Sequence, residues 1–316
     1  EGRLSHAYLL SGRPNIGKKT LAIELAKAAN CLGEKKPCSM CSQCVRIAKG
    51  VHTDTRIVGL NSGNLNTDVN RVNIGIDSIR DIQRESNLKP YEGRYRFFIF
   101  DRAETMSEEA ANAILKTLEE PPDQVILIML TTNHRLLLPT VLSRCQHLSL
   151  RPVPSSVIVQ NLITKRGLDE AKSQKIAHLS NGRPGWALQA ASENSVIEEL
   201  QNKITNIEKI VSGTLEERFS YAADIASWFR KDRESVRAEI ELWMEWWRDV
   251  LLIKAEAPIF MTNLSRHDKL RTTADSISST QLCESILTIQ KTLELLERNV
   301  NPRLALENMM LTLPRV

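Results

Sequence analysis

The chain has 316 residues, of which 42% are hydrophobic and 25% are charged, so it carries enough apolar surface for more than one core. Its formal net charge of +4 allows a nucleic-acid partner but is far below the charge density of a protein that coats DNA alone. No uninterrupted apolar run reaches the roughly 18 residues of a membrane-spanning helix, so we expect a soluble protein without a membrane partner.

The first half of the chain alternates short apolar runs with helical patterns. We predict strands at residues 6–12, 55–60, 94–101 and 124–130, and helices at residues 19–32 and 76–87. Strands that alternate with helices are typical of a parallel sheet, and the continuously apolar runs RFFIF and VILIML indicate central strands covered on both faces. A polar stretch at residues 59–73 is a loop candidate. The pattern predicts an α/β domain over residues 1–152.

The second half of the chain has a helical pattern throughout. The strand signal ends after residue 154, and helices then follow with breaks at residues 181–185 and near Pro258. The helices become longer and more amphipathic after about residue 212. We therefore predict a small helical domain over residues 153–212 and an all-α domain over residues 213–316.

Tryptophan is concentrated in the last of these domains, where four of the five tryptophans lie between residues 228 and 247. In the helix predicted at residues 235–256, Trp243, Trp247 and Val250 share one face. This spacing is more typical of core packing than of a platform on which bases stack.

Residues Gly12 to Thr20, GRPNIGKKT, lie between a predicted strand and a predicted helix, which is the context of a phosphate-binding P-loop. Gly12, Gly17 and Lys18 fit the pattern in which backbone N–H groups surround phosphates and a lysine reaches the outer ones. The next position normally carries a hydroxyl that binds Mg²⁺, but here it is Lys19. If the motif is shifted by one residue so that Lys19 and Thr20 form its Lys-Thr pair, Lys18 stands at the position of the second glycine. We predict a degenerate nucleotide site; a chance glycine-rich turn is the alternative.

The strand FFIFD ends in Asp101, at the position where an ATPase uses Asp to support Mg²⁺. The residue that follows is normally a Glu that polarises the attacking water, but here it is Arg102. A cation cannot act as a general base, although Arg102 is equally well explained as a solvated or ion-paired residue at a strand end. The two losses predict that the chain does not hydrolyse ATP with Mg²⁺, and they leave open whether it binds nucleotide.

Four of the six cysteines lie within fourteen positions: Cys31, Cys38, Cys41 and Cys44. Four thiolates on a short loop form a closed tetrahedral site that suits Zn²⁺ and leaves no position for a reacting water. We therefore predict a structural zinc site in an insertion at residues 31–44. A disulfide pair and an iron–sulfur cluster are the alternatives.

Three arginines outside these motifs are candidates for contact with a partner's phosphates. Arg144 follows the helix predicted after the last buried strand and could stabilise phosphate charge on a neighbouring subunit, as an arginine finger. Arg80 and Arg84 share one face of a helix and could contact the phosphates of duplex DNA. The alternatives are an ordinary surface residue at 144 and a solvated helix face on which Asp77 and Asp81 pair with the two arginines.

Several motifs together resemble the bacterial clamp-loader subunits of DNA polymerase III, which are AAA+ proteins. They are HAYLLSG, the degenerate P-loop, the zinc cysteines, FFIFD, SEEAANAILKTLEEPP (107–122), TTNHRLLLPTVLSRCQ (131–146) and NPRLALENMML (301–311). The resemblance implies an α/β AAA+ core, a helical lid and a helical collar that assembles a hetero-oligomer. It also implies gamma/tau and delta subunits, the sliding clamp and primer-template DNA as partners, in the bacterial cytoplasm.

Three departures separate this chain from the gamma/tau ATPase pattern. Lys19 and Arg102 replace the metal-binding hydroxyl and the catalytic Glu, and Gly185 stands where the lid of the family's ATPases carries a sensor Arg. Arg183, two residues earlier, fits a turn residue better than a substitute. The resemblance therefore implies a non-hydrolysing subunit that aids ATP-dependent clamp loading and supplies Arg144 in trans. A catalytically active gamma/tau-type ATPase and a zinc-stabilised DNA-binding protein that works alone are the alternatives.

Overall fold

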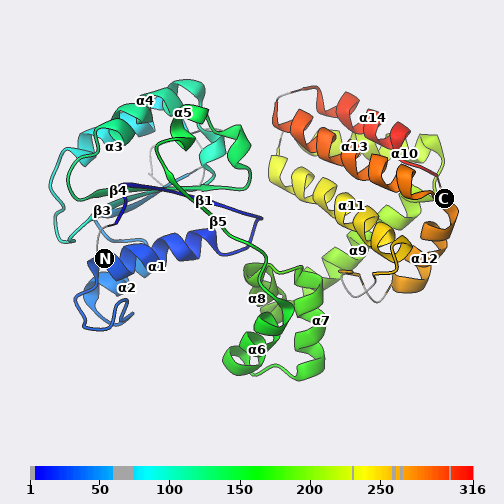
Figure 1. Cartoon of the computed structure of the whole chain (residues 1–316), viewed down its shortest axis with the longest axis horizontal. Coiled ribbons are helices and arrows are strands. Elements are labelled where there is room, and N and C mark those ends of the chain that lie inside the picture. Colours follow the sequence, from blue (N-terminus) through cyan, green and yellow to red (C-terminus); the bar gives the residue numbers. More distant parts are fainter. Residues whose placement is uncertain are drawn as a thin grey trace. The chain divides into compact units, whose positions relative to one another are not determined.

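The computed structural model describes residues 4–59, 74–229, 231–257, 261–263, 266–298 and 300–315. The chain divides into two compact units (Figure 1). The first is Glu1–Pro154 with Gly182–Trp186, and the second is Ser155–Asn181 with Ala187–Val316. The loop predicted at residues 59–73 lies outside the described residues, except for Gly59.

The first unit contains a five-stranded parallel sheet with the strand order β2-β3-β4-β1-β5. Its strands are β1 (Ala7–Ser11), β2 (Thr55–Val58), β3 (Arg96–Phe100), β4 (Val125–Thr131) and β5 (Gln146–Ser149). Every residue of β1, β3 and β4 is buried, as expected for apolar strands covered on both faces. The predicted parallel α/β fold is therefore confirmed.

Two layers of helices enclose this sheet (Figure 1). The first layer is α1 (Lys18–Asn30) with α2 (Ser42–Ala48), and the second is α3 (Ile76–Ser86), α4 (Glu108–Glu119) and α5 (Pro139–Leu142). Alternate residues of each central strand face opposite layers, so the sheet contributes to two separate hydrophobic cores. Two short 3₁₀ helices follow the central strands: η1 (Ala103–Thr105) and η2 (His134–Leu136).

A buried ion pair fixes the loop that enters β3. Asp54 is fully buried, and its carboxylate accepts a hydrogen bond from Nη2 of Arg96 at 2.9 Å. Backbone N–H groups of Tyr91, Glu92 and Gly93 donate to the same carboxylate, each at 2.8 Å. Burial opposes ionisation of Asp54, but these donors outweigh it and hold its pKa below the ordinary value. The loop between α3 and β3 is therefore held by charge as well as by packing.

The described part of the second unit is helical. Its helices are α6 (Ser155–Arg166), α7 (Glu170–Ser180), α8 (Pro184–Ser192), α9 (Asn194–Val211), α10 (Leu215–Phe229), α11 (Arg233–Lys254), α12 (His267–Ser276), α13 (Ser279–Glu297) and α14 (Pro302–Thr312). The first residues of α8 belong to the first unit. The predicted break at residues 181–185 is confirmed, because α7 ends at Ser180 and α8 begins at Pro184.

The core of the second unit is built around α11. Trp243, Trp247 and Val250 are at most 1% exposed, so their predicted role in core packing is confirmed. Ile204 and Val211 of α9 belong to the same hydrophobic cluster. The division of the chain into domains at residues 1–152, 153–212 and 213–316 stays a prediction.

A buried arginine joins the ends of two helices in this unit. Arg218 on α10 is 2% exposed, and its guanidinium donates five hydrogen bonds of 2.6 to 3.2 Å to backbone carbonyls. The acceptors lie at the C-terminal ends of α9 and α14: Ile210, Val211, Met310, Leu313 and Pro314. Helix C-termini carry partial negative charge, so this cation is stabilised by the carbonyls it caps.

Replacing Arg218 with Met should destabilise the second unit by roughly 3 kcal/mol or more, because buried carbonyls lose their donors. Urea unfolding followed by tryptophan fluorescence measures this loss, since four of the five tryptophans lie in the second unit. Arg271→Met, at an exposed position of α12, is the matched control and should change stability by less than about 0.5 kcal/mol. Equal unfolding midpoints for the two variants would show that Arg218 is not needed to hold these helix ends.

Candidate nucleotide, metal and phosphate-contact sites

The topology of the sheet brings the residues of the predicted nucleotide site to one edge. β1, β3 and β4 are parallel neighbours in the order β3-β4-β1, so their carboxyl ends lie along the same edge. The P-loop follows β1, Asp101 follows β3 and Thr132 follows β4. Ligand sites of open parallel sheets form at this edge, so the fold gives the degenerate motif its expected place.

The P-loop keeps the backbone shape that its glycines predict. Gly12 has φ 152°, and a Cβ at this residue would lie 2.8 Å from the carbonyl oxygen of Leu150. Gly17 has φ 103° and is the N-cap of α1, so both positions favour glycine. The Nζ of Lys18 donates to the carbonyl oxygens of Gly12 and Arg13, at 2.7 and 2.9 Å. Lys18 thus links the end of the loop to its beginning.

The residue after this lysine contacts the second motif directly. Lys19 is on the first turn of α1, and its Nζ lies 3.0 Å from Oδ2 of Asp101. Thr20, in the next position, is exposed on the same helix. The sequence placed Lys19 and Asp101 in one site, but it did not predict this ion pair. The feature of the sequence that could have indicated this ion pair is Lys19 itself, a long cationic side chain at a position that normally carries a short metal-binding hydroxyl.

A carboxylate that the sequence pattern missed follows closely after Arg102 in the chain. Arg102 has φ 63°, in the left-handed region, and is the N-cap of η1. Two residues later, Glu104 accepts hydrogen bonds on Oε1 from the hydroxyl and the backbone N–H of Thr132, at 2.9 and 3.3 Å. These bonds hold the Glu104 side chain against the end of β4. The sequence pattern missed Glu104 because it examines only the residue that directly follows Asp101.

The start of α8 approaches the P-loop within the first unit. The backbone N–H of Gly185 donates to the carbonyl oxygen of Asn15 at 2.9 Å. A Cβ at Gly185 would lie 2.8 Å from that same oxygen, so a side chain fits here only if the P-loop shifts. The Arg183 guanidinium lies over the ring of Trp186, 5.9 Å from its centroid. A backbone contact therefore occupies the position at which the resemblance implies a sensor Arg in the ATPases.

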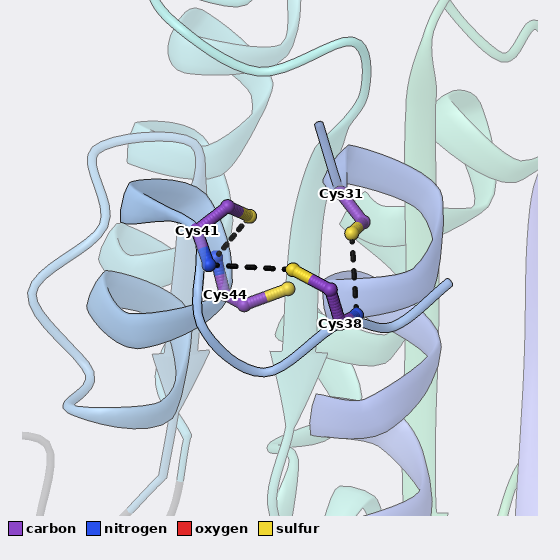
Figure 2. A group of neighbouring side chains, drawn as sticks. All are labelled: Cys31, Cys38, Cys41 and Cys44. Atoms are coloured by element: carbon purple, nitrogen blue, oxygen red, sulfur yellow. Dashed lines mark hydrogen bonds between the residues drawn. The ribbon is translucent and has the colours of Figure 1, made fainter. Parts of the chain in front are cut away.

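The four predicted zinc ligands converge at the end of α1 (Figure 2). Their sulfur atoms, those of Cys31, Cys38, Cys41 and Cys44, all lie within 4.8 Å of one another. A tetrahedron with bonds of about 2.3 Å has edges of roughly 3.8 Å, so a small contraction would place all four sulfurs around one Zn²⁺. The residues present therefore fit a structural zinc ion.

Backbone donors already surround these sulfurs as they do in metal-binding knuckles. The N–H of Cys38 points to Cys31 Sγ, and the N–H of Cys41 points to Cys38 Sγ, both at 3.3 Å (Figure 2). A backbone hydrogen bond from Cys44 lowers the pKa of Cys41 to about 6, whereas burial raises the pKa of Cys44 to about 12. A metal must displace the proton of Cys44, so binding releases protons.

The cysteine loop is joined to the sheet by polar side chains. Lys27 of α1 is buried, and its Nζ donates to Ser39 Oγ inside the loop at 3.0 Å. The same Nζ also lies 2.7 Å from Oε1 of Glu24, so this lysine links α1 to the loop. On α2, Gln43 donates to the carbonyl oxygen of Glu92 at 3.0 Å, and Arg46 pairs with the carboxylate of the same residue. Glu92 also contributes an N–H to buried Asp54, so the loop and the sheet share one network.

Arg144, the predicted arginine finger, lies two residues beyond the end of α5. Its Nη2 lies 2.6 Å from Oε1 of Glu119 at the end of α4, and its Nη1 donates to the carbonyl oxygen of Thr140 at 2.9 Å. The side chain is 35% exposed. The finger candidate is therefore at the surface of the first unit and is held there by a carboxylate.

Arg80 and Arg84 line a polar cleft of about 380 Å³ between α3 and α4. Other lining residues include Gln83, Asn87, Lys116 and Glu120. Each arginine is 3.6 Å from an aspartate on its own helix, Asp77 or Asp81, and all four side chains are more than half exposed. Long, exposed pairs of this kind contribute little, so the arginines remain able to exchange these partners for phosphates. Lys116 adds a third cation that the helix pattern alone did not predict.

Removing one thiol from the cysteine cluster should release the metal. Cys38→Ser should lower zinc content from about one per chain to a small fraction, because a closed site then lacks one of its ligands. Cys283→Ser, at an exposed cysteine of α13, is the control and should retain zinc. Metal analysis after gel filtration checks both variants. Zinc missing from the wild-type protein, or retained in full by Cys38→Ser, would refute the assignment.

Known proteins resemble this chain in its first half and over its whole length. Residues 1–154 match the sequence model of a family described as DNA polymerase III, delta subunit. The first half is also similar to DNA polymerase III subunit tau of Bacillus subtilis (strain 168), with 36% identity over 159 residues. That match covers 50% of this chain and 26% of the relative.

The resemblance to a delta-prime subunit runs almost from end to end. DNA polymerase III subunit delta' of Bacillus subtilis (strain 168) is 28% identical over 317 residues. The match covers 98% of this chain and 91% of the relative. DNA polymerase III subunit gamma of Buchnera aphidicola subsp. Acyrthosiphon pisum (strain APS) is 32% identical, over 70% of this chain and 60% of its own length. The resemblance to DNA polymerase III subunits that the motifs indicated is confirmed, and with the delta-prime subunit it extends over nearly the whole chain.

Proposed function

We propose that the chain is a clamp-loader subunit of DNA polymerase III that aids ATP-dependent loading of the sliding clamp onto primed DNA. The similarity to the delta-prime subunit over 98% of the chain carries this proposal. The partners would be gamma/tau and delta subunits, the sliding clamp and primer-template DNA, in the bacterial cytoplasm. No helix among the described residues has the length and apolar character that crossing a membrane needs.

The subunit would hydrolyse no ATP itself, and three features of its nucleotide site support this part of the proposal. Lys19 is in ion-pair contact with Asp101, and Arg102 stands where a general base is needed. Gly185 bonds to the P-loop through its backbone and provides no cation for the phosphates. The P-loop would then act as a structural element of the first unit.

Assembly with other subunits would use the helical second unit. Large apolar side chains are exposed on α13 and α14: Leu287 is 62%, Leu304 is 62% and Leu311 is 57% exposed. Leu304 and Leu311 are seven residues apart and therefore lie on one face of α14. Exposed leucines of this kind are suited to packing against helices of neighbouring subunits in a hetero-oligomer.

Arg144 would act in trans, on ATP held by an adjacent subunit. Its exposure and its position next to α5 allow contact with a neighbouring protein. The Glu119 carboxylate would hold the guanidinium in place until the more highly charged phosphates of a neighbour replace it. The finger would then stabilise charge that develops during hydrolysis, although this chain performs no hydrolysis itself.

Arg144→Ala should leave subunit assembly intact and lower the DNA-stimulated ATPase activity of the reconstituted loader by at least about tenfold, because the transition state loses a charge partner. Arg135→Ala, at an exposed arginine of η2 in the same segment, is the control and should retain activity. Steady-state phosphate release, with gel filtration to confirm assembly, measures both effects. Unchanged turnover in an intact Arg144→Ala complex would exclude the finger role.

A catalytically active ATPase of the gamma/tau type is the second candidate function. The 36% identity of the first half to a tau subunit favours it. The matched region covers only 26% of that relative, and the ion pair between Lys19 and Asp101 opposes the metal binding that such an ATPase needs. We therefore favour the non-hydrolysing subunit.

The cleft between α3 and α4 would contact the DNA backbone. Arg80, Arg84 and Lys116 converge on it, and their exposed side chains can reach phosphates without burial of their charges. The formal net charge of +4 is too small for tight DNA binding by the isolated chain, so this contact would add to those of other subunits.

Replacing both Arg80 and Arg84 with Ala should weaken primer-template binding by the assembled loader and make it less sensitive to salt. Each lost phosphate contact should reduce the slope of log K against log salt by about 0.9. Lys165→Ala with Arg166→Ala, two exposed cations of α6, is the matched control. Fluorescence anisotropy at several salt concentrations gives the slopes. Identical slopes for the two double variants would place the DNA elsewhere.

A further inference from the structure

The nucleotide site of P-loop ATPases contains Mg²⁺. The residues of this chain at the two positions that normally bind the ion show whether it fits here. The ion is normally held between the hydroxyl that follows the P-loop lysine and the Asp at the end of a nearby strand. Here these two positions are Lys19 and Asp101, and their Nζ and Oδ2 atoms are 3.0 Å apart. One expected ligand is a cation and the other is already its partner, so the residues present do not fit a divalent metal.

We propose that the Lys19 ammonium takes the place of the metal at Asp101 and excludes divalent cations from this site. The inference rests on the proposed non-hydrolysing function and gives a physical cause for it. Lys19 is thereby a specificity-determining residue, because its charge sets which cation neutralises the strand-end carboxylate. One substitution within the P-loop motif would then be enough to keep Mg²⁺ from Asp101.

The backbone around this pair is fixed by other contacts. Lys18 binds two P-loop carbonyls, which holds the start of α1, and the N–H of Asp101 donates to the carbonyl oxygen of Val58 at 2.7 Å. A Cβ at Gly59 would lie 3.2 Å from the Cβ of Asp101, so the chain passes close to this carboxylate. The two Cα positions are therefore set by the sheet and by α1. A shorter side chain at residue 19 would release the carboxylate without a change of fold.

The ion pair between Lys19 and Asp101 affects the binding of a divalent cation more than it affects the stability of the fold. The side chains of Lys19 and Asp101 are 51% and 34% exposed, and ion pairs this exposed contribute little to folding. A divalent ion bound to Asp101 would have to lie within a few ångströms of the ammonium, where like charges repel strongly. It would also have to replace Lys19 as the counter-ion. Charge repulsion and competition for the carboxylate both disfavour metal binding. Neither effect requires the ion pair to stabilise the protein.

The test uses the purified full chain and the fluorescent nucleotide mant-ADP as probe, titrated in Mg²⁺ and in EDTA. Wild-type affinities in the two buffers should agree within about twofold, or binding should be undetectable in both. Lys19→Thr should bind at least about tenfold more tightly in Mg²⁺ than in EDTA, because Asp101 and a hydroxyl can then hold the ion. Adding Asp101→Asn to this variant should abolish the difference.

Lys175→Thr, at an exposed lysine of α7, is the matched control and should behave as wild type. Thermal unfolding confirms that each variant is folded. A metal dependence of about tenfold in the wild type, or none in a folded Lys19→Thr variant, would overturn the proposal. The titration involves neither other subunits nor hydrolysis, so its outcome is separate from that of the Arg144 experiment on the assembled loader.

Discussion

Burial of the three central strands between two helical layers fixes the positions of the residues of the predicted nucleotide site. β1, β3 and β4 are buried throughout, and their carboxyl ends place the P-loop, Asp101 and Thr132 along one edge. The packing of these strands does not depend on whether the side chain of residue 19 carries a hydroxyl or an amino group. The sheet would therefore hold these positions together with or without metal-binding side chains at them.

The same sheet also supports the cysteine loop. Cys31 directly follows α1, and the helix that carries Cys44 is joined through Glu92 to the buried ion pair of Asp54 and Arg96. A zinc ion at the four sulfurs would thus stabilise a region that is already connected to the entry of β3. This is consistent with a structural metal, because all four coordination positions would be protein ligands.

Much of the fold was predictable from sequence because its signals are local. Continuous apolar runs predicted β3 and β4, and cysteine spacing predicted the sulfur cluster. The missed contacts join residues far apart in the chain. Lys19 and Asp101 are 82 positions apart, and Arg218 binds carbonyls more than 90 positions away at α14. Hydrophobic periodicity along the sequence cannot indicate such contacts, because the tertiary fold determines which strand and helix ends lie next to each other.

The proposed subunit keeps the shape of an ATP site without its metal-dependent chemistry. Measuring ATP hydrolysis by the purified wild-type chain in Mg²⁺ tests it most directly, with Lys18→Ala as the control for contaminating ATPases. We expect no turnover above that of the Lys18→Ala protein. Mg²⁺-dependent hydrolysis that Lys18→Ala abolishes would contradict it and favour an active ATPase of the gamma/tau type.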